Sequence, residues 1–142
     1  MVKSDPRFSH DGLHDQLTNC AAPPLFYSHI NRVITGSNRT GAPFSLLSIS
    51  LPISSIADQI AATAHVINQL MRKEDLCGRL GQYQFVIALA GDYSGGEKLL
   101  ERISAALPQE ISPSMSAEIV EWRQGETSLE LLYRLDLLTE IR

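Results

Sequence analysis

The chain has 142 residues, of which 44% are hydrophobic and 20% are charged, and its formal net charge is −4. This length fits one domain with a sizeable hydrophobic core, and the composition is ordinary for a globular protein. The negative charge argues against a general surface for nucleic acid polymers or anionic membranes, although two or three arginines could still hold a small anionic ligand.

The sequence carries no signal that directs a chain into or across a membrane. No apolar run approaches the roughly 18–20 residues that span a bilayer. Residues 1–13 form a polar lead-in without the apolar stretch of a signal peptide. We therefore expect a cytoplasmic protein with no membrane partner, in which Cys20 and Cys77 are free, buried thiols.

The first half of the chain alternates helical and extended patterns. Residues 23–38 begin with prolines and space their apolar side chains as a helix does. Residues 44–51 form a short apolar run between Pro43 and Pro52, which predicts a buried strand. Residues 53–73 place apolar side chains along one face of a long helix.

The second half adds a hairpin, two helices and a further strand. These elements are predicted at 76–80 (strand), 84–90 (strand), 96–107 (helix), 116–123 (strand) and 127–141 (helix). The first two strands flank a predicted tight turn at Gly81-Gln82, and a loop is predicted over 91–96. The last helix opens with a Thr and Ser N-cap candidate and a Glu three residues later, which is typical of a capping box.

The predicted order is therefore helix, strand, helix, two-stranded hairpin, helix, strand, helix. This order predicts an α/β (α+β) fold, in which helices flank a central, mainly antiparallel sheet.

Residues 15–18 read Asp-Gln-Leu-Thr, and Gly81 and Phe85 enclose three residues at the predicted hairpin. These segments, with the elements between them, resemble in the same order the GGDEF family of diguanylate cyclase domains, which join two GTP molecules into cyclic di-GMP. Residues 15–18 match the family's opening Asp-x-Leu-Thr box, and Gly81 and Phe85 match the first and last positions of the motif that names the family. The resemblance covers residues 14–140. It implies a single degenerate GGDEF-like domain over 14–142, with a fold related to class III nucleotidyl cyclases and polymerase palms.

The motif itself departs from the family pattern. It reads Gly81, Gln82, Tyr83, Gln84, Phe85. The two acidic positions of the family motif are thus Tyr83 and Gln84, which carry no charge. Its second glycine, where the backbone must approach the nucleotide, is Gln82, whose side chain should obstruct a ligand there.

The aspartate that the family places on its first strand falls on Ser48 or Ser50. Cyclisation of GTP resembles metal-assisted phosphoryl transfer, in which carboxylates hold the Mg²⁺ ions that clamp the phosphates. Because these carboxylates are missing together, we expect no catalysis, no metal site and no cofactor.

A second site of the family, its inhibitory product site, is retained in the sequence. Arg72 and Asp75 form an Arg-x-x-Asp motif, and five residues separate Asp75 from Gly81, as in the family. Arg102 matches a further arginine that family members supply from the helix after the hairpin. An arginine fork can donate two hydrogen bonds to a phosphate or to the O6/N7 edge of guanine, and a carboxylate can accept from guanine's N1–H and amino group. The resemblance implies cyclic di-GMP binding through Arg72, Asp75 and Arg102.

Arg72 also has a purely structural interpretation, because the dipole of the preceding helix and pairing with Asp75 favour an arginine there. Three functions therefore stay open. The first is an inactive receptor that binds cyclic di-GMP and relays the signal to an unidentified effector protein or through a homodimer. The second is an interaction or dimerisation module of the same fold that binds no nucleotide, and the third is a residual enzyme or GTP-binding regulator.

Overall fold

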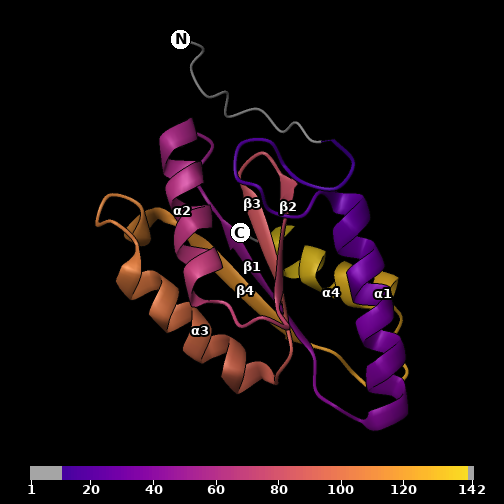
Figure 1. The fold of residues 1–142 in the computed structure, drawn as a ribbon. Coiled ribbons are helices and arrows are strands. Elements are labelled where there is room, and N and C mark those ends of the chain that lie inside the picture. Colours follow the sequence, from indigo (N-terminus) through magenta and orange to yellow (C-terminus); the bar gives the residue numbers. More distant parts are fainter. Residues whose placement is uncertain (1–10, 141–142) are drawn as a thin grey trace.

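The computed structural model describes residues 11–140, and within them the helices and strands follow the predicted order (Figure 1). The elements are α1 (Pro23–Thr40), β1 (Ser45–Ser50), α2 (Ala57–Leu70), β2 (Leu76–Gly81), β3 (Gln84–Leu89), α3 (Tyr93–Ala106), the short 3₁₀ helix η1 (Ser112–Ser114), β4 (Ser116–Glu121) and α4 (Ser128–Glu140). The predicted α+β fold class is confirmed.

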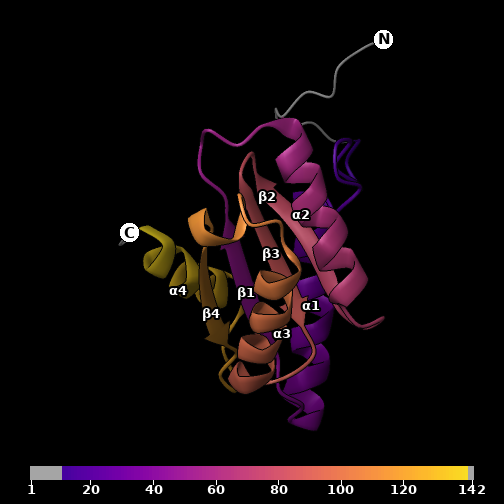
Figure 2. The same ribbon diagram turned by 90° about the vertical axis from the view of Figure 1, so that its left-hand side faces the viewer.

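The four strands form one sheet in the order β2-β3-β1-β4, and all three strand pairs are antiparallel. β1 lies in the middle, where Leu47 pairs with Ile87 on one side and with Ile119 on the other. Helices α2 and α3 cover one face of the sheet, and α1 and α4 cover the other (Figures 1 and 2). The predicted central, mainly antiparallel sheet flanked by helices is therefore observed.

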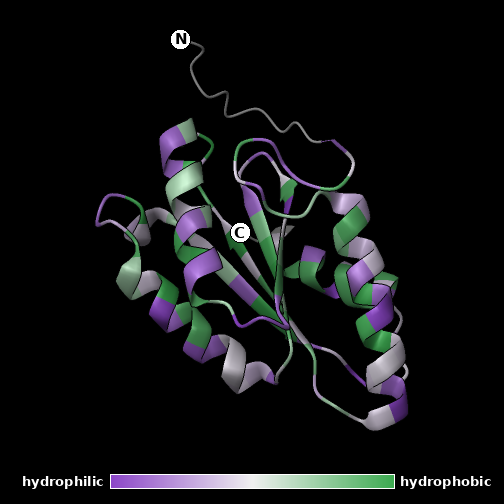
Figure 3. Ribbon diagram, in the orientation of Figure 1, coloured by the Kyte–Doolittle hydropathy of each residue, from purple (hydrophilic) through white to green (hydrophobic). Residues whose placement is uncertain are grey.

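The alternation of side chains along the strands divides the core between the two faces. Leu47 and Ile87 point into the cluster under α2 and α3, whereas Leu46 and Val86 point into the cluster under α1 and α4. This is the period-two pattern of a strand buried on both sides. Figure 3 shows that hydrophobic residues dominate the central strands, whereas the helices mix hydrophobic and hydrophilic residues.

The segment that precedes α1 adds a short parallel bridge to the outer edge of β2. The backbone N–H of Ala21 donates to the carbonyl of Cys77 over 2.9 Å, and that of Arg79 donates to the carbonyl of Ala21 over 3.0 Å. These bonds satisfy part of an edge that would otherwise be exposed. Residues 14–22 are thus part of the domain and extend the sheet at its β2 edge.

Two local predictions were wrong. The loop predicted over 91–96 ends earlier, because α3 begins at Tyr93, where the Asp92 carboxylate caps the helix by accepting from the N–H of Gly95 over 2.9 Å. The hairpin turn lies at Gln82-Tyr83 instead of Gly81-Gln82, because Gly81 still pairs with Gln84 after a bulge in β2.

The capping box predicted at the start of the last helix is present. The backbone N–H of Thr127 donates to the Glu130 carboxylate over 3.0 Å, and the N–H of Glu130 donates to the Thr127 hydroxyl over 3.1 Å.

Within the described residues, none of the helices has both the length and the hydrophobicity needed to cross a lipid bilayer.

A close contact at Gly78 joins β2 to α1, and it yields a stability prediction. A Cβ atom at Gly78 would lie 2.6 Å from a ring carbon of Phe26, which is fully buried. Because the ring has no space to retreat, we expect Gly78→Ala to lower the free energy of unfolding by about 1–3 kcal/mol in urea denaturation. The matched control is Gly36→Ala in α1, where a Cβ meets no atom within 4 Å. There we expect no loss, or a gain of about 0.5–1 kcal/mol from helix propensity. Equal stability of the two variants would contradict the packing described.

Candidate functional site

Arg72, Asp75 and Arg102 line one pocket, although they come from distant parts of the sequence. Arg72 and Asp75 lie in the turn between α2 and β2, and Arg102 lies on α3. The pocket has a volume of about 420 Å³, and the end of β3 with the following Gly91 closes one side of it. The fold therefore brings together the three residues of the predicted site.

The Asp75 carboxylate is a fixed part of the pocket. One oxygen accepts from the backbone N–H of Arg72 over 3.1 Å, and the other accepts from the N–H of Ala90 over 2.9 Å. The side chain is only 8% exposed. These bonds join the α2–β2 turn to the end of β3, so Asp75 has a structural role. Each oxygen keeps a second lone pair, so the carboxylate can still accept a hydrogen bond from a ligand.

Three exposed cations surround this carboxylate. Arg72, Lys98 and Arg102 all line the pocket, and within residues 11–140 their side chains make no hydrogen bond or ion pair. The pocket therefore has positive charge available for an anionic ligand, beside an acceptor at Asp75. Lys98 was not among the residues predicted for this site, although its position four residues before Arg102 puts both on the same face of α3.

The hairpin of β2 and β3 lies at the other end of β2, and neutral hydrogen bonds join it to β1 and to the residue after β1. The carbonyl of Tyr83 accepts from the N–H of Leu51 over 2.8 Å. The amide of Gln84 donates to the Ser48 hydroxyl over 3.1 Å. Gln84, at an acidic position of the family motif, is thus bonded to Ser48, one of the two serines on which the family's first-strand aspartate falls, and neither side chain is charged. In the part of the chain that the structure describes, no group of three His, Cys, Asp or Glu residues is placed to hold a metal ion.

A buried ion pair connects the hairpin turn to the segment that precedes α1. Nη1 of Arg79 lies 2.9 Å and 3.1 Å from the two carboxylate oxygens of Asp15, and both side chains are fully buried. Nη2 of Arg79 donates to the carbonyl of Gln82 in the turn over 2.7 Å. The Asp15 carboxylate also accepts from the N–H and the hydroxyl of Thr18, over 2.9 Å and 2.6 Å. Asp15 of the Asp-x-Leu-Thr box therefore has a structural role. The sequence alone does not show this role, because its partner Arg79 lies 64 residues further along the chain.

Cys20 and Cys77 lie in the core cluster on the α2–α3 face of the sheet. They belong to the two segments that the Ala21–Gly78 bridge joins. Both are free and buried, as expected from the sequence. A hydrogen bond with Cys20, together with burial, raises the pKa of the Cys77 thiol well above its usual range. Cys77 therefore stays protonated and packs as a small hydrophobic residue.

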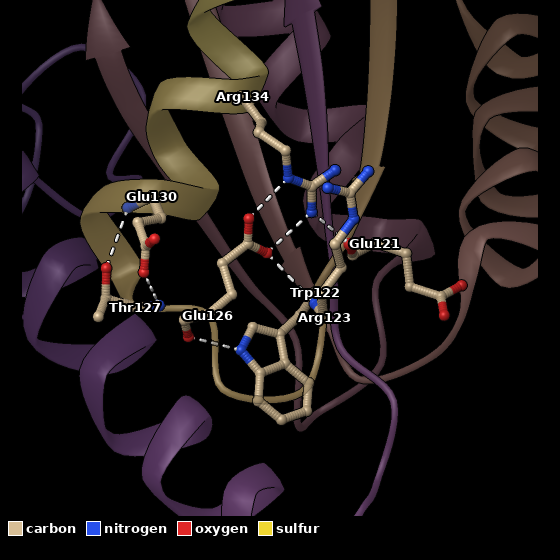
Figure 4. A network of polar contacts seen from close by, with 7 residues as sticks. All are labelled: Glu121, Trp122, Arg123, Glu126, Thr127, Glu130 and Arg134. Atoms are coloured by element: carbon tan, nitrogen blue, oxygen red, sulfur yellow. Dashed lines mark hydrogen bonds and ion pairs between the residues drawn. The ribbon is translucent and has the colours of Figure 1, made fainter.

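A polar network at the β4–α4 connection fixes the last helix (Figure 4). The guanidinium of Arg134 donates to both carboxylate oxygens of Glu126, over 2.6 Å and 2.8 Å, and to the carbonyl of Glu121 over 2.6 Å. Nε1 of Trp122 donates to the carbonyl of Glu126 over 2.8 Å. Partial burial acts to raise the pKa of Glu126, but the hydrogen bonds from Arg134 and from the N–H of Arg123 outweigh it, so the net shift is downward. The network orients α4 on the sheet, and the positive charge of Arg134 is paired with the Glu126 carboxylate.

Comparison with known proteins connects this arrangement to one fold family. A scan against protein-family models and a search of curated proteins both find no match to this sequence. Among solved structures, the GGDEF domain of DgcB from Caulobacter crescentus in complex with c-di-GMP has a TM-score of 0.79 at 18% identity, with 91% of this chain and 88% of that chain covered. The GGDEF domain of TpbB (YfiN) from Pseudomonas aeruginosa has a TM-score of 0.75 at 22% identity, with 90% and 87% covered. Diguanylate cyclase SiaD from the same organism, in complex with its activator SiaC, has a TM-score of 0.77 at 21% identity, with 87% and 55% covered. The chain therefore has the fold of GGDEF domains.

The buried ion pair leads to a stability prediction. Replacing one partner, by Asp15→Ala or by Arg79→Met, leaves the other charge buried and unpaired, and we expect it to cost about 3–5 kcal/mol of unfolding free energy in urea denaturation. The double variant should lose less than the sum of the two single losses, because no unpaired charge remains. Glu97→Ala, which removes an exposed acid from α3, is the control and should stay within about 0.5 kcal/mol of the unmodified chain. Additive losses in the double variant would show that the two side chains do not stabilise the fold as a pair.

Proposed function

We propose that this chain, which has the fold of GGDEF domains, is a catalytically inactive receptor for cyclic di-GMP that relays the signal through a protein partner. The observation that carries the proposal is the single pocket lined by Arg72, Asp75 and Arg102, the three residues that the family's product site would use. We propose a cytoplasmic location and no requirement for Mg²⁺.

The chemistry of the pocket suits both parts of this ligand. Arg72 and Arg102 can donate charge-assisted hydrogen bonds to phosphate oxygens or to the O6/N7 edge of guanine, and Lys98 adds a third positive charge. The buried Asp75 carboxylate is held by two backbone donors and presents its remaining lone pairs to guanine's N1–H and amino group. Two of the structural neighbours, DgcB from Caulobacter crescentus and LapD from Vibrio cholerae, were solved with c-di-GMP bound.

The hairpin supports the inactive half of the proposal. A two-metal reaction on GTP needs carboxylates at the phosphates. The residues at those positions are Tyr83 and Gln84 in the hairpin and Ser48 or Ser50 on β1, and Gln84 is already bonded to Ser48. The neutral pair removes the electrostatic basis for holding Mg²⁺.

Calorimetric titration tests the receptor function. We expect cyclic di-GMP to bind the unmodified chain, and Arg72→Ala or Arg102→Ala to weaken binding at least about tenfold, since each removes charge-assisted hydrogen bonds of about 1.5–3 kcal/mol. Lys73→Ala is the matched control, because Lys73 is an exposed cation next to Arg72 that does not line the pocket. It should change affinity less than about twofold.

Two outcomes would count against the receptor function. No heat of binding at high micromolar ligand would favour the interaction module of the same fold that binds no nucleotide. Equal losses for Arg72→Ala and Lys73→Ala would mean that the ligand responds to overall charge and not to the pocket.

A second experiment tests the absence of catalysis. Incubation of the chain with GTP and Mg²⁺, followed by chromatography, should give no cyclic di-GMP, because the hairpin lacks the carboxylates that the reaction requires. GTP should also give no heat of binding in a titration. Product at a rate above that of a heat-denatured sample would contradict the proposal.

A further inference from the structure

Helix α4 is apolar on two sides, and only one side faces the sheet. Leu131 and Leu135 are buried in the core, with 0% and 1% exposure. On the outer side, Leu129 is 78% exposed, Tyr133 64% and Leu137 41%. A helix that is hydrophobic on more than one side is normally covered on each of them. The outer side of α4 is thus an apolar surface without a cover among the described residues.

This surface forms one wall of a groove between α1 and α4. The groove has a volume of about 890 Å³, and its apolar lining comes from Tyr27, Leu129, Leu132 and Tyr133. Residues of α1 and α4 line the groove, whereas residues of α3, of the end of α2 and of the α2–β2 turn line the pocket with Arg72 and Arg102. The pair α1 and α4 covers the opposite face of the sheet from the pair α2 and α3 (Figure 1). The groove is therefore a separate feature from the proposed nucleotide site.

The charges along the groove are acidic. Glu130 and Asp136 line it, and no lysine or arginine of residues 11–140 does. The nearest cation on α4, Arg134, is held by Glu126 and the carbonyl of Glu121. The groove therefore combines apolar anchoring surface with a negative rim.

This charge pattern distinguishes between possible occupants. In a two-fold dimer the same patch meets itself, so Glu130 and Asp136 of both copies would gather around one apolar seam. Like charges placed together at an interface oppose association, and the net charge of −4 acts in the same direction. An anionic membrane surface is disfavoured for the same reason. A basic partner meets no such opposition.

We propose that the α1–α4 groove docks a basic amphipathic helix of a partner protein. The outer residues Leu129, Tyr133 and Leu137 are spaced at i, i+4 and i+8, a stripe of about 12 Å at the 1.5 Å rise of a helix. A helix that presents apolar side chains at i, i+3 or i+4, and i+7 matches that length and packs between two helices by ridges and grooves. Lysine or arginine beside its apolar stripe would face Glu130 and Asp136. The proposal does not rest on nucleotide binding.

The test uses three synthetic, fluorescently labelled peptides and the whole chain. The first peptide carries a helical leucine stripe flanked by lysines, the second carries the same stripe flanked by glutamates, and the third is a scrambled form of the first. We expect the lysine peptide to raise its fluorescence anisotropy on titration with the chain, and the other two to bind at least about tenfold more weakly.

Matched substitutions distinguish binding in the groove from non-specific electrostatic or hydrophobic association with the rest of the surface. Tyr133→Ser should weaken binding of the lysine peptide about tenfold, whereas Tyr93→Ser, an exposed tyrosine at the start of α3, should change it less than about twofold. Glu130→Gln with Asp136→Asn should weaken binding more than Glu97→Gln with Glu101→Gln, which removes the same charge from α3. Glutamine at 130 can still accept the capping bond from the N–H of Thr127.

Several results would overturn the proposal. These are no binding of the lysine peptide at about 1 mM, equal effects of Tyr133→Ser and Tyr93→Ser, or equal binding of the lysine and glutamate peptides. Sedimentation velocity supplies a further one, since a dimer that Tyr133→Ser dissociates would assign the groove to a second copy of this chain. None of these results bears on the calorimetry of cyclic di-GMP, so this proposal and the receptor function fail independently.

Discussion

An arginine and an aspartate buried together determine how the start of this chain meets the sheet. Neither Arg79 nor Asp15 could be buried alone, because a buried, unpaired charge costs several kcal/mol. Their pairing brings the segment before α1 against β2, where the Ala21 bridge continues the sheet. The same guanidinium holds the carbonyl of Gln82, so the shape of the hairpin turn depends on a residue 67 positions earlier through Arg79. If this pair were broken, the edge of the sheet and the turn would lose their support together.

Strand β2 separates two regions with opposite character. At its start, Asp75 and the exposed cations around it keep the charges that an anionic, guanine-containing ligand would require. At its end, the hairpin is held by a neutral hydrogen bond between Gln84 and Ser48. A strand of six residues spans about 20 Å, so the two regions do not share charged groups. The proposed ligand pocket therefore does not depend on the charges of the hairpin.

The sheet also divides the molecule into a proposed ligand side and a proposed partner side. The pocket with Arg72 and Arg102 lies by α2 and α3, and the acidic, apolar groove lies between α1 and α4. The proposed receptor function needs a second surface that can reach another protein. The groove is such a surface, and β1, paired on both sides in the centre of the sheet, is the rigid element that both faces share.

The sequence by itself determined the order of the elements, because the helical and strand periods of the apolar residues survive in the amino-acid pattern alone. It also determined the absence of charged residues at 81–85 and the spacing of Arg72 and Asp75, since these are matters of residue identity. Local backbone geometry was harder to predict from the sequence, because the start of α3 depends on the Asp92 cap and the hairpin turn depends on a bulge in β2. Only the tertiary structure decided which distant residues meet. It placed Lys98 and Arg102 in one pocket with Asp75 and gave Asp15 its partner Arg79. It also left the outer side of α4 without a cover from the other residues of 11–140. These are consequences of how the elements pack and not of any local pattern.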